Sequence, residues 1–354
     1  PVFKYMSKMS ITGTTHNFGA GGNDVWLLKY NSSGIQEWYQ TYGGAEWDIG
    51  RSVQQTSDNG FIITGHTESY GNGSWDLWLI KTDSNGNEEW NQTFGTSNQE
   101  SGYCVIETSD GGYAITGFGS GHYLWLIKTD ENGTLIWDYT YGNGSTTGYS
   151  LIETSDGGFA VTGYNYLNGA THGYVLKTDS LGITEWQKLF GGNYEDNNGR
   201  SILETENSEY IIAGTLFNND SLVNQSYDIG IIKIDSLGNE IMSQTFGGTD
   251  TEKGYSSQQT TDGGYIITGV TKSYGSGNWD VYVIKTTPII YLPYSGPIWH
   301  VATTGSDETG VGSEENPFAT IQHGIDAASD GDTVLVAAGT YVENINYNGK
   351  NIAV

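Results

Sequence analysis

The chain has 354 residues, enough for one large and one small domain. Its 41 acidic and 14 basic side chains give a formal net charge of −27, and a field of that sign excludes DNA, RNA and anionic lipid as partners. No apolar run approaches the ~18 residues that a spanning helix needs, so we expect no membrane span.

The first landmark along the chain is a ten-residue repeat. It reads TSDNGFIITG at 56–65, TSDGGYAITG at 108–117, TSDGGFAVTG at 154–163 and TTDGGYIITG at 260–269. Repeats at a fixed spacing indicate copies of one structural unit. Degenerate copies included, its last glycine falls at six positions: Gly13, Gly65, Gly117, Gly163, Gly214 and Gly269.

Each unit holds four short segments that are typical of β-strands. In the second unit they cover 52–56, 61–67, 77–83 and 88–94, and clusters of Gly, Asn, Asp and Ser separate them. The third segment begins LWLI and is apolar on both faces, whereas a sheet with one solvated face would alternate. Sheets buried on both faces must stack on copies of themselves, and radial stacking gives a β-propeller.

We therefore predict an all-β fold, with a six-bladed β-propeller over residues 1–294 and seven blades as the alternative. Residues 1–4 would supply the inner strand of the first blade, and 289–294 the outer strand of the last. These two blades would exchange no strand, so packing between their sheet faces alone would close the ring.

The turns have a structural explanation and one alternative. SDGG between the first and second strands tolerates the positive φ of a tight hairpin, and TDSNGN at 82–87 does the same between the third and fourth. Alternatively, loops such as 83–87 bind structural calcium, although the other ligands of an EF-hand loop are missing. We expect no cofactor apart from such a calcium ion.

Three landmarks together carry a family resemblance: DGGYIITG at 262–269, LWLIKTD at 77–83 and EWYQTYGG at 37–44. The pattern resembles the bacterial and archaeal secreted β-propeller repeat proteins of the SBBP type, over roughly residues 1–290. The resemblance implies an exported protein with several domains, either extracellular or at the cell surface. It implies no particular reaction.

The pattern changes after a linker at 295–300. In the domain that follows, 301–354, the apolar spacing of 318–329 predicts a helix, with Asn316 and Pro317 as its N-cap and first residue. This part of the chain therefore forms a second, smaller domain of a different kind.

Two apolar strands are predicted after the helix, at 333–337 and 351–354. The string GDTV…GTYVENI…GKNI resembles the opening of right-handed parallel β-helix proteins of the pectate-lyase-like class, which implies a capping helix and a first coil. A solenoid needs about three coils to bury a continuous core, and the sequence stops inside the second. We expect either a fragment of a longer protein, which is favoured, or self-association through 333–354.

The loops that join the second and third strands, and those between units, are long and variable, unlike the tight turns at the other strand ends. In an up-and-down blade these loops share one face of the ring, where binding function concentrates. Aromatic side chains there either stack on sugars and anchor a protein, or pack within their own loops. The candidate ligand-binding residues are Trp47, His66, Tyr70, His122, Tyr164, Tyr166, His172, Tyr194 and Phe217.

No HExxH, CxxC, GxSxG or P-loop pattern occurs, so no catalytic residue and no metal site is predicted. Glu107, Glu153 and Glu204 recur at one register and are assigned structural or solvated roles. The lone Cys104 is expected to be a packed, inert thiol. A shared register assigns three aromatic residues to blade structure: Trp75, Tyr227 and Trp279.

The sequence as a whole predicts a non-enzymatic extracellular or cell-surface protein, a recognition or spacer module that binds a glycan or a protein through its variable-loop face. One alternative is the N-terminal part of a polysaccharide-binding or polysaccharide-cleaving β-helix protein. The other is a structural subunit of an extracellular assembly or filament.

Overall fold

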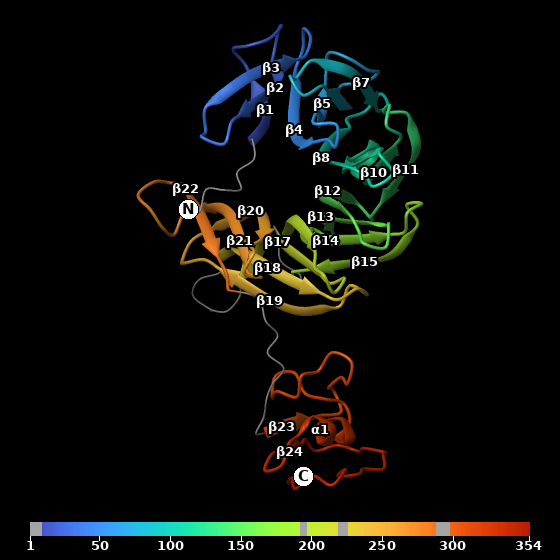
Figure 1. The fold of residues 1–354 in the computed structure, drawn as a ribbon, viewed down its shortest axis with the longest axis vertical. Coiled ribbons are helices and arrows are strands. Elements are labelled where there is room, and N and C mark those ends of the chain that lie inside the picture. Colours follow the sequence, from blue (N-terminus) through green and yellow to red (C-terminus); the bar gives the residue numbers. More distant parts are fainter. Residues whose placement is uncertain (1–8, 192–196, 219–225, 288–297) are drawn as a thin grey trace. The chain divides into compact units, whose positions relative to one another are not determined.

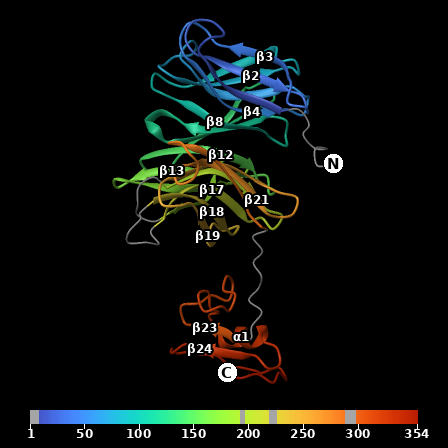
Figure 2. The ribbon, with the colours of Figure 1, turned by 90° about the vertical axis from the view of Figure 1, so that its left-hand side faces the viewer.

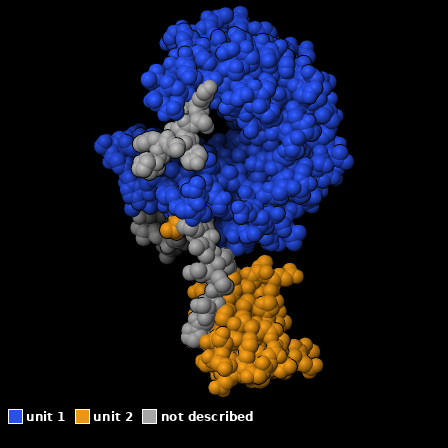
Figure 3. All heavy atoms as spheres, viewed as in Figure 1, with its two compact units in different colours: residues 1–286 blue, residues 287–354 orange. Residues whose placement is uncertain are grey.

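The computed structural model describes residues 9–191, 197–218, 226–287 and 298–354. The chain divides into two compact units, residues 1–286 and residues 287–354, which are coloured separately in Figure 3. The linker was predicted to extend to residue 300, but a strand already begins at Ile298.

The first unit contains six antiparallel sheets that follow one another round a ring, here numbered 1 to 6 in chain order (Figure 1). The predicted all-β, six-bladed propeller is therefore confirmed. Sheet 1 has strands β1 (Met9–Thr15), β2 (Asp24–Tyr30) and β3 (Gln36–Tyr42). Sheet 2 has β4 (Asp48–Gln55), β5 (Phe61–Thr67), β6 (Asp76–Thr82) and β7 (Glu88–Phe94). Sheet 3 has β8 (Ser101–Glu107), β9 (Tyr113–Phe118), β10 (Leu124–Thr129) and β11 (Leu135–Tyr141), with the short helix η1 (Ser120–His122).

The other three sheets repeat the same order of strands. Sheet 4 has β12 (Ser145–Glu153), β13 (Phe159–Leu167), β14 (Ala170–Thr178) and β15 (Thr184–Phe190). Sheet 5 has β16 (Asn198–Glu204), β17 (Tyr210–Asn218), β18 (Ser226–Ile234) and β19 (Glu240–Phe246). Sheet 6 has β20 (Glu252–Gln259), β21 (Tyr265–Thr271) and β22 (Asp280–Lys285).

In each four-stranded sheet the first strand is innermost and the fourth is outermost (Figure 1). Seen from the side, the sheets succeed one another in chain order from β2 to β19 (Figure 2). The space-filling view shows the ring hollowed at its centre (Figure 3). The innermost strands therefore surround this central opening.

Apolar faces of neighbouring sheets form the core of the ring. Leu77 and Leu79 of β6 are fully buried against Val105, Tyr113 and Ile115 of sheet 3. Three similar clusters join sheets 1 and 2, 3 and 4, and 4 and 5. The unbroken apolar runs of the second and third strands follow from this, because each of these strands packs on both sides.

The corresponding face of sheet 6 is not buried. Val281 and Val283 occupy the register of Leu77 and Leu79, yet they are 81% and 54% exposed. We expected the faces of the first and last sheets to pack together and close the ring. That expectation is wrong at Val281 and Val283, which no other sheet of the described residues covers. The predicted end strands, 1–4 and 289–294, lie outside the described residues.

The second unit has a small core around one helix. Strands β23 (Ile298–Val301) and β24 (Thr333–Val336) pair in parallel, and helix α1 (Ile321–Ala327) packs beside them through the buried Ile325. The helix begins later than predicted. Its N-cap is Thr320, whose side chain accepts a hydrogen bond from the backbone N–H of His323, and this bond satisfies a free donor of the first turn.

The two predicted strands of this unit differ in outcome. The first, 333–337, is observed as β24, whereas 351–354 forms only an isolated parallel bridge between Ala353 and Thr333. One short helix and a small parallel sheet are thus shown. The start of a β-helix stays a prediction.

Candidate functional site

The innermost strands of sheets 2 to 6 share one irregularity. In β4, Gly50 pairs with Gly65 and Ser52 with Thr64, so Arg51 has no partner in the ladder. A β-bulge of this kind leaves one residue unpaired and redirects its side chain. The residues at this position, one from each sheet and here called the bulge row, are Arg51, Tyr103, Tyr149, Arg200 and Tyr255.

The bulge explains the last glycine of the ten-residue repeat. A Cβ added to Gly65 would clash with the carbonyl oxygen of Ile49, and one added to Gly163 would clash with that of Thr147. Glycine is therefore needed because the bulged strand approaches its neighbour too closely for any side chain. The repeat that defines the fold thus also creates the bulge row.

The side chains of the bulge row touch from one sheet to the next. The Arg51 guanidinium lies over the Tyr103 ring, 4.5 Å from its centroid, and the rings of Tyr103 and Tyr149 meet edge to face at 5.1 Å. The Arg200 guanidinium lies 3.8 Å from the Tyr149 centroid and 6.0 Å from that of Tyr255. Because the innermost strands surround the central opening, the row runs round it.

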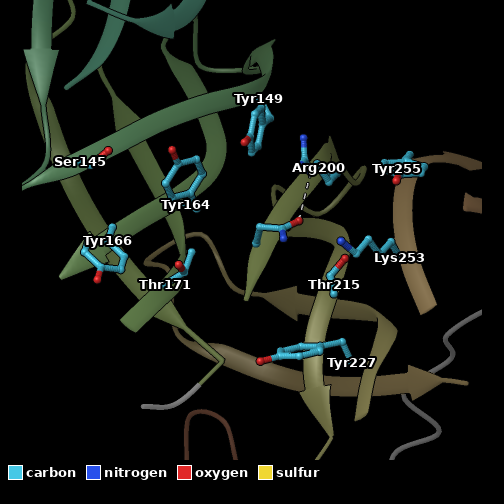
Figure 4. Close-up of a pocket in the computed structure, with 11 residues that line it drawn as sticks. Ser145, Tyr149, Tyr164, Tyr166, Thr171, Arg200, Thr215, Tyr227, Lys253 and Tyr255 are labelled. Atoms are coloured by element: carbon cyan, nitrogen blue, oxygen red, sulfur yellow. Dashed lines mark hydrogen bonds between the residues drawn. The ribbon is translucent and has the colours of Figure 1, made fainter. Parts of the chain in front are cut away.

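A pocket of about 460 Å³ opens beside the bulge row at sheets 4, 5 and 6 (Figure 4). Its walls come from strand ends next to the variable loops, including the hairpin between β13 and β14. The pocket therefore lies on the predicted variable-loop face. Its lining residues are Ser145, Tyr149, Tyr164, Tyr166, Thr171, Asn198, Arg200, Thr215, Tyr227, Lys253 and Tyr255.

The arginines of the bulge row differ from the lysines of the third strands. Lys81 is buried and pairs with Asp58 at 2.7 Å and Glu89 at 2.9 Å. Neither Arg51 nor Arg200 forms an ion pair with a carboxylate of the described residues. The Nε–H of Arg200 donates a hydrogen bond to Asn198 Oδ1, at 3.2 Å. The row therefore brings positive charge to the pocket that no described carboxylate neutralises.

The same charges act on the tyrosine between them. Burial raises the pKa of Tyr149 to about 12, and Arg200 and Arg51 oppose that shift. The phenol is therefore neutral at physiological pH and keeps its hydrogen-bond donor.

Three of the predicted aromatic residues belong to this pocket or its support. Tyr164 and Tyr166 line it, and the Tyr164 ring lies 5.6 Å from that of Tyr149. Phe217 does not line it but packs edge to face on Tyr227, a lining residue, at 5.3 Å. Tyr194 lies outside the described residues. That these side chains bind a ligand stays a prediction.

Two other predicted aromatic residues lie on sheet 2 and its loops, away from this pocket. Trp47 is exposed, and so is Tyr70. The Tyr70 hydroxyl donates a hydrogen bond to the Gly43 carbonyl at 3.0 Å, and its ring packs on Trp78. Tyr70 also lines a separate pocket of about 410 Å³ with Tyr42 and Trp78.

The predicted histidines do not gather. His66 is buried, stacks on Trp75 at 4.6 Å and lies 3.1 Å from Ser101 Oγ, so it is not on the surface as expected. Burial, and then Arg51, lower the pKa of His66 to about 4. His122 stacks on Phe118 at 5.2 Å, and His172 is half-buried in β14. Among the described residues, no group of three or more His, Cys, Asp or Glu side chains is placed to hold a metal.

The candidate calcium loop has hydrogen bonds of its own. The Asp83 carboxylate accepts from the backbone N–H groups of Asn85 and Asn87 and from the Asn87 side chain, at 2.7–2.9 Å. These bonds close 83–87 into a turn. Structural calcium there stays a prediction. No helix in the described part of the chain is long and apolar enough to cross a membrane.

Sequence reasoning missed Arg51, Arg200, Lys253 and Tyr255, and it assigned Tyr227 to blade structure although Tyr227 also lines the pocket. A signal was available. The chain contains two arginines, and both stand between a glycine and a serine at the same register of the repeat.

Comparisons with known protein families and with curated proteins find no match. Among solved structures, Sqt1 from Chaetomium thermophilum is 11% identical with a TM-score of 0.43, covering 75% of this chain and 66% of that chain. The Pan2 WD40 domain of Neurospora crassa is 11% identical with a TM-score of 0.46, covering 75% and 76%. A GH43 endo-arabinanase from Bacillus licheniformis is 13% identical with a TM-score of 0.34, covering 66% and 92%.

These similarities concern the fold alone. The resemblances to SBBP-type repeat proteins and to pectate-lyase-like β-helix proteins stay predictions.

Proposed function

We propose that the first unit is a non-enzymatic recognition module of an extracellular or cell-surface protein, and that the pocket at sheets 4 to 6 binds a saccharide. The observation that carries the proposal is the gathering of Tyr149, Tyr164, Tyr166 and Tyr255 around one open, largely polar pocket. Tyrosine suits a sugar because its ring covers the apolar face of a pyranose while its hydroxyl bonds to the polar edge.

The surrounding groups complete such a site. Thr171 and Thr215 offer hydroxyl groups to sugar hydroxyls, and such polar groups fix the orientation of a ligand in a pocket. The lining residues named here come from strands rather than from long loops. A site built on packed strands loses little conformational freedom on binding, which favours affinity.

The test is a glycan array with the intact chain, followed by titration calorimetry on the saccharides that bind. We expect Tyr164→Ala to weaken binding by roughly 10- to 100-fold, as removal of an aromatic anchor does. Tyr139→Ala is the matched control, because Tyr139 is an exposed tyrosine on the outermost strand β11. Absence of saccharide binding, or equal losses in the two variants, would contradict the proposal.

A second candidate function is supported by the second unit, which exposes several apolar side chains. Val342 is 96% exposed, and Leu335, Ile345, Tyr347 and Val354 are also exposed. Several exposed apolar side chains in so small a unit favour a role in an interaction with another chain. We propose self-association through 333–354 as the role of these residues, in keeping with a subunit of an extracellular assembly.

A further inference from the structure

We propose that the saccharide bound by the pocket is an acidic one, whose carboxylate or sulfate group is held by Arg200 of the bulge row. The inference rests on the proposed function of the pocket and names its ligand class. It is based on three observations: where Arg51 and Arg200 lie, their lack of carboxylate partners among the described residues, and the stacking of their guanidinium groups on tyrosine rings.

The placement of the arginines is selective. The whole chain has two, and both occupy the bulge position, where the other sheets carry tyrosine. The chain has 41 acidic side chains against 14 basic ones, yet neither arginine pairs with a carboxylate of the described residues. The third-strand lysines of sheets 2 to 6 do pair with carboxylates, and Lys177, for example, pairs with both Asp156 and Glu185 at 2.9 Å.

The stacked geometry leaves the arginine edge available. Tyr149 covers one face of the Arg200 guanidinium, and Asn198 accepts from its Nε, so both fix its orientation. Figure 4 shows Arg200 between Tyr149 and Tyr255 at the margin of the pocket. No other hydrogen bond of Arg200 is found among the described residues. A fixed guanidinium with free N–H groups matches the paired oxygens of a carboxylate or sulfate.

Two further features narrow the ligand class. Lys253 is exposed and lines the same pocket, so a second positive charge lies near Arg200. The net charge of −27 repels a long polyanion before it reaches the ring. The ligand that fits both facts is a short saccharide, or a chain with widely spaced acidic groups, because local attraction then exceeds the general repulsion.

The experiment compares three probes by titration calorimetry on the intact chain. They are an oligosaccharide containing glucuronic acid, the same oligosaccharide with its carboxyl groups reduced to alcohols, and a sulfated oligosaccharide of equal length. We expect the wild-type chain to bind one of the two acidic probes at least tenfold more tightly than the reduced probe. Which acidic probe binds more tightly identifies the anionic group.

The variants test whether the arginine causes this preference. Arg200→Gln should weaken binding of the acidic probe at least tenfold more than binding of the reduced probe, so that the preference is lost. Lys188→Gln, which removes an exposed charge on the outermost strand β15, should keep the preference. If Arg200→Gln fails to fold by circular dichroism, Arg200→Lys replaces it and should lower the preference, because it loses the planar pair of donors.

The outcomes separate the two proposals. Equal binding of acidic and reduced probes would overturn the acidic ligand and leave the saccharide pocket standing. Binding of no probe by the wild-type chain, together with an empty glycan array, would overturn both. If Lys188→Gln also loses the preference for the acidic probe, the preference results from net charge, and the role of Arg200 is overturned. If the bulge row only stabilises the ring, Arg200→Gln should lower the melting temperature and leave the preference for the acidic probe unchanged. That result would also overturn the proposal.

Discussion

At the scale of the residue, most positions of the ten-residue repeat are explained by a specific contact. In the third sheet, Thr108 Oγ1 donates to Asp110 Oδ1 at 2.6 Å, and the N–H of Gly112 donates to the same carboxylate at 3.0 Å. Lys128, which is buried, reaches Asp110 and the Thr129 carbonyl, each at 2.9 Å. Burial opposes ionisation, but these bonds outweigh it and lower the pKa of Asp110 to about 2. The repeat is thus a turn anchored to its own sheet.

His66 gives a prediction at this scale. Its pKa is about 4 in the folded chain and near 6.5 when unfolded, so the unfolded state takes up the proton first as pH falls. This histidine should therefore lower the free energy of unfolding by about 2 kcal/mol between pH 7 and pH 4.5. His66→Phe keeps the stacking on Trp75 and should remove that part of the pH dependence.

The measurement is denaturant unfolding of both proteins at the two pH values. The control is His16→Phe, because His16 is exposed. The pH dependence lost in His66→Phe should exceed any that is lost in this control. An unchanged pH dependence in His66→Phe would show that His66 is protonated within the fold or is not buried.

Part of the site could be predicted from single residues and part could not. Tyr164 and Tyr166 were predicted because the sequence indicates a long variable loop there, and loop residues on a rigid scaffold are the usual contacts of a ligand. The structure places both in β13 instead, yet they still line the pocket. Arg51 and Arg200 were missed because the first strand of each unit was expected to start after them, at 52 in the second unit, whereas β4 starts at Asp48. A bulge depends on pairing between strands, which a single segment does not reveal.

At the scale of the element, neighbouring sheets are joined by a recurring polar contact as well as by apolar packing. The Glu153 carboxylate of sheet 4 accepts from both the N–H and the Oγ of Ser109 in sheet 3, at 2.7 Å each. Glu107 and Glu204 bind Ser57 and Ser155 in the same way, which confirms their structural role.

The contact between sheets 5 and 6 differs in both of its residues. The turn of sheet 5 carries Glu206 at the position of Ser109, and sheet 6 carries Gln259 at the position of the accepting glutamate. A neutral partner there avoids placing two carboxylates together. The residue at the accepting position of one sheet is therefore matched to the turn residue that it meets on the neighbouring sheet.

A pair of substitutions tests the packing of the sheets. Leu79→Ala should lower the free energy of unfolding by about 2–5 kcal/mol, because it leaves a cavity between sheets 2 and 3. Val283→Ala at the same register of sheet 6 should cost less than about 0.5 kcal/mol, because that side chain is exposed. Denaturant unfolding measures both. A large loss in Val283→Ala would show that another surface covers this face in solution.

The strands could be predicted from the sequence wherever one sheet repeats the pattern of another. The number of sheets and the two-sided burial of their middle strands followed from period and composition. The start of α1 did not, because Thr320 and the pair Asn316–Pro317 both carry capping signals, and only the contacts of the folded unit favour Thr320. The unpacked face of sheet 6 was also unpredictable, since its residues match those of the buried faces.

At the scale of the whole molecule, the two units carry different surfaces. The first presents the tyrosine-lined pocket and the bulge row, and the second presents exposed apolar side chains after α1. Recognition and assembly are therefore proposed for separate parts of the chain, so each can be removed without the other.

The assembly proposal predicts that the 354-residue chain associates with increasing concentration. Sedimentation velocity should show this association, and Val342→Lys should reduce it, because a charge is costly in an apolar contact. Leu181→Lys is the control, since Leu181 is a similarly exposed apolar residue in a turn of the propeller. A wild-type chain that stays monomeric at all concentrations, or equal effects of the two substitutions, would contradict the proposal.

The saccharide pocket is the central claim, and a crystal structure of the chain with an oligosaccharide selected on the array tests it most directly. The account predicts a sugar ring against Tyr149 and Tyr164, with its acidic group on Arg200. A saccharide bound instead in the pocket beside Tyr70, or on the second unit, with the pocket at sheets 4 to 6 unoccupied, would contradict it.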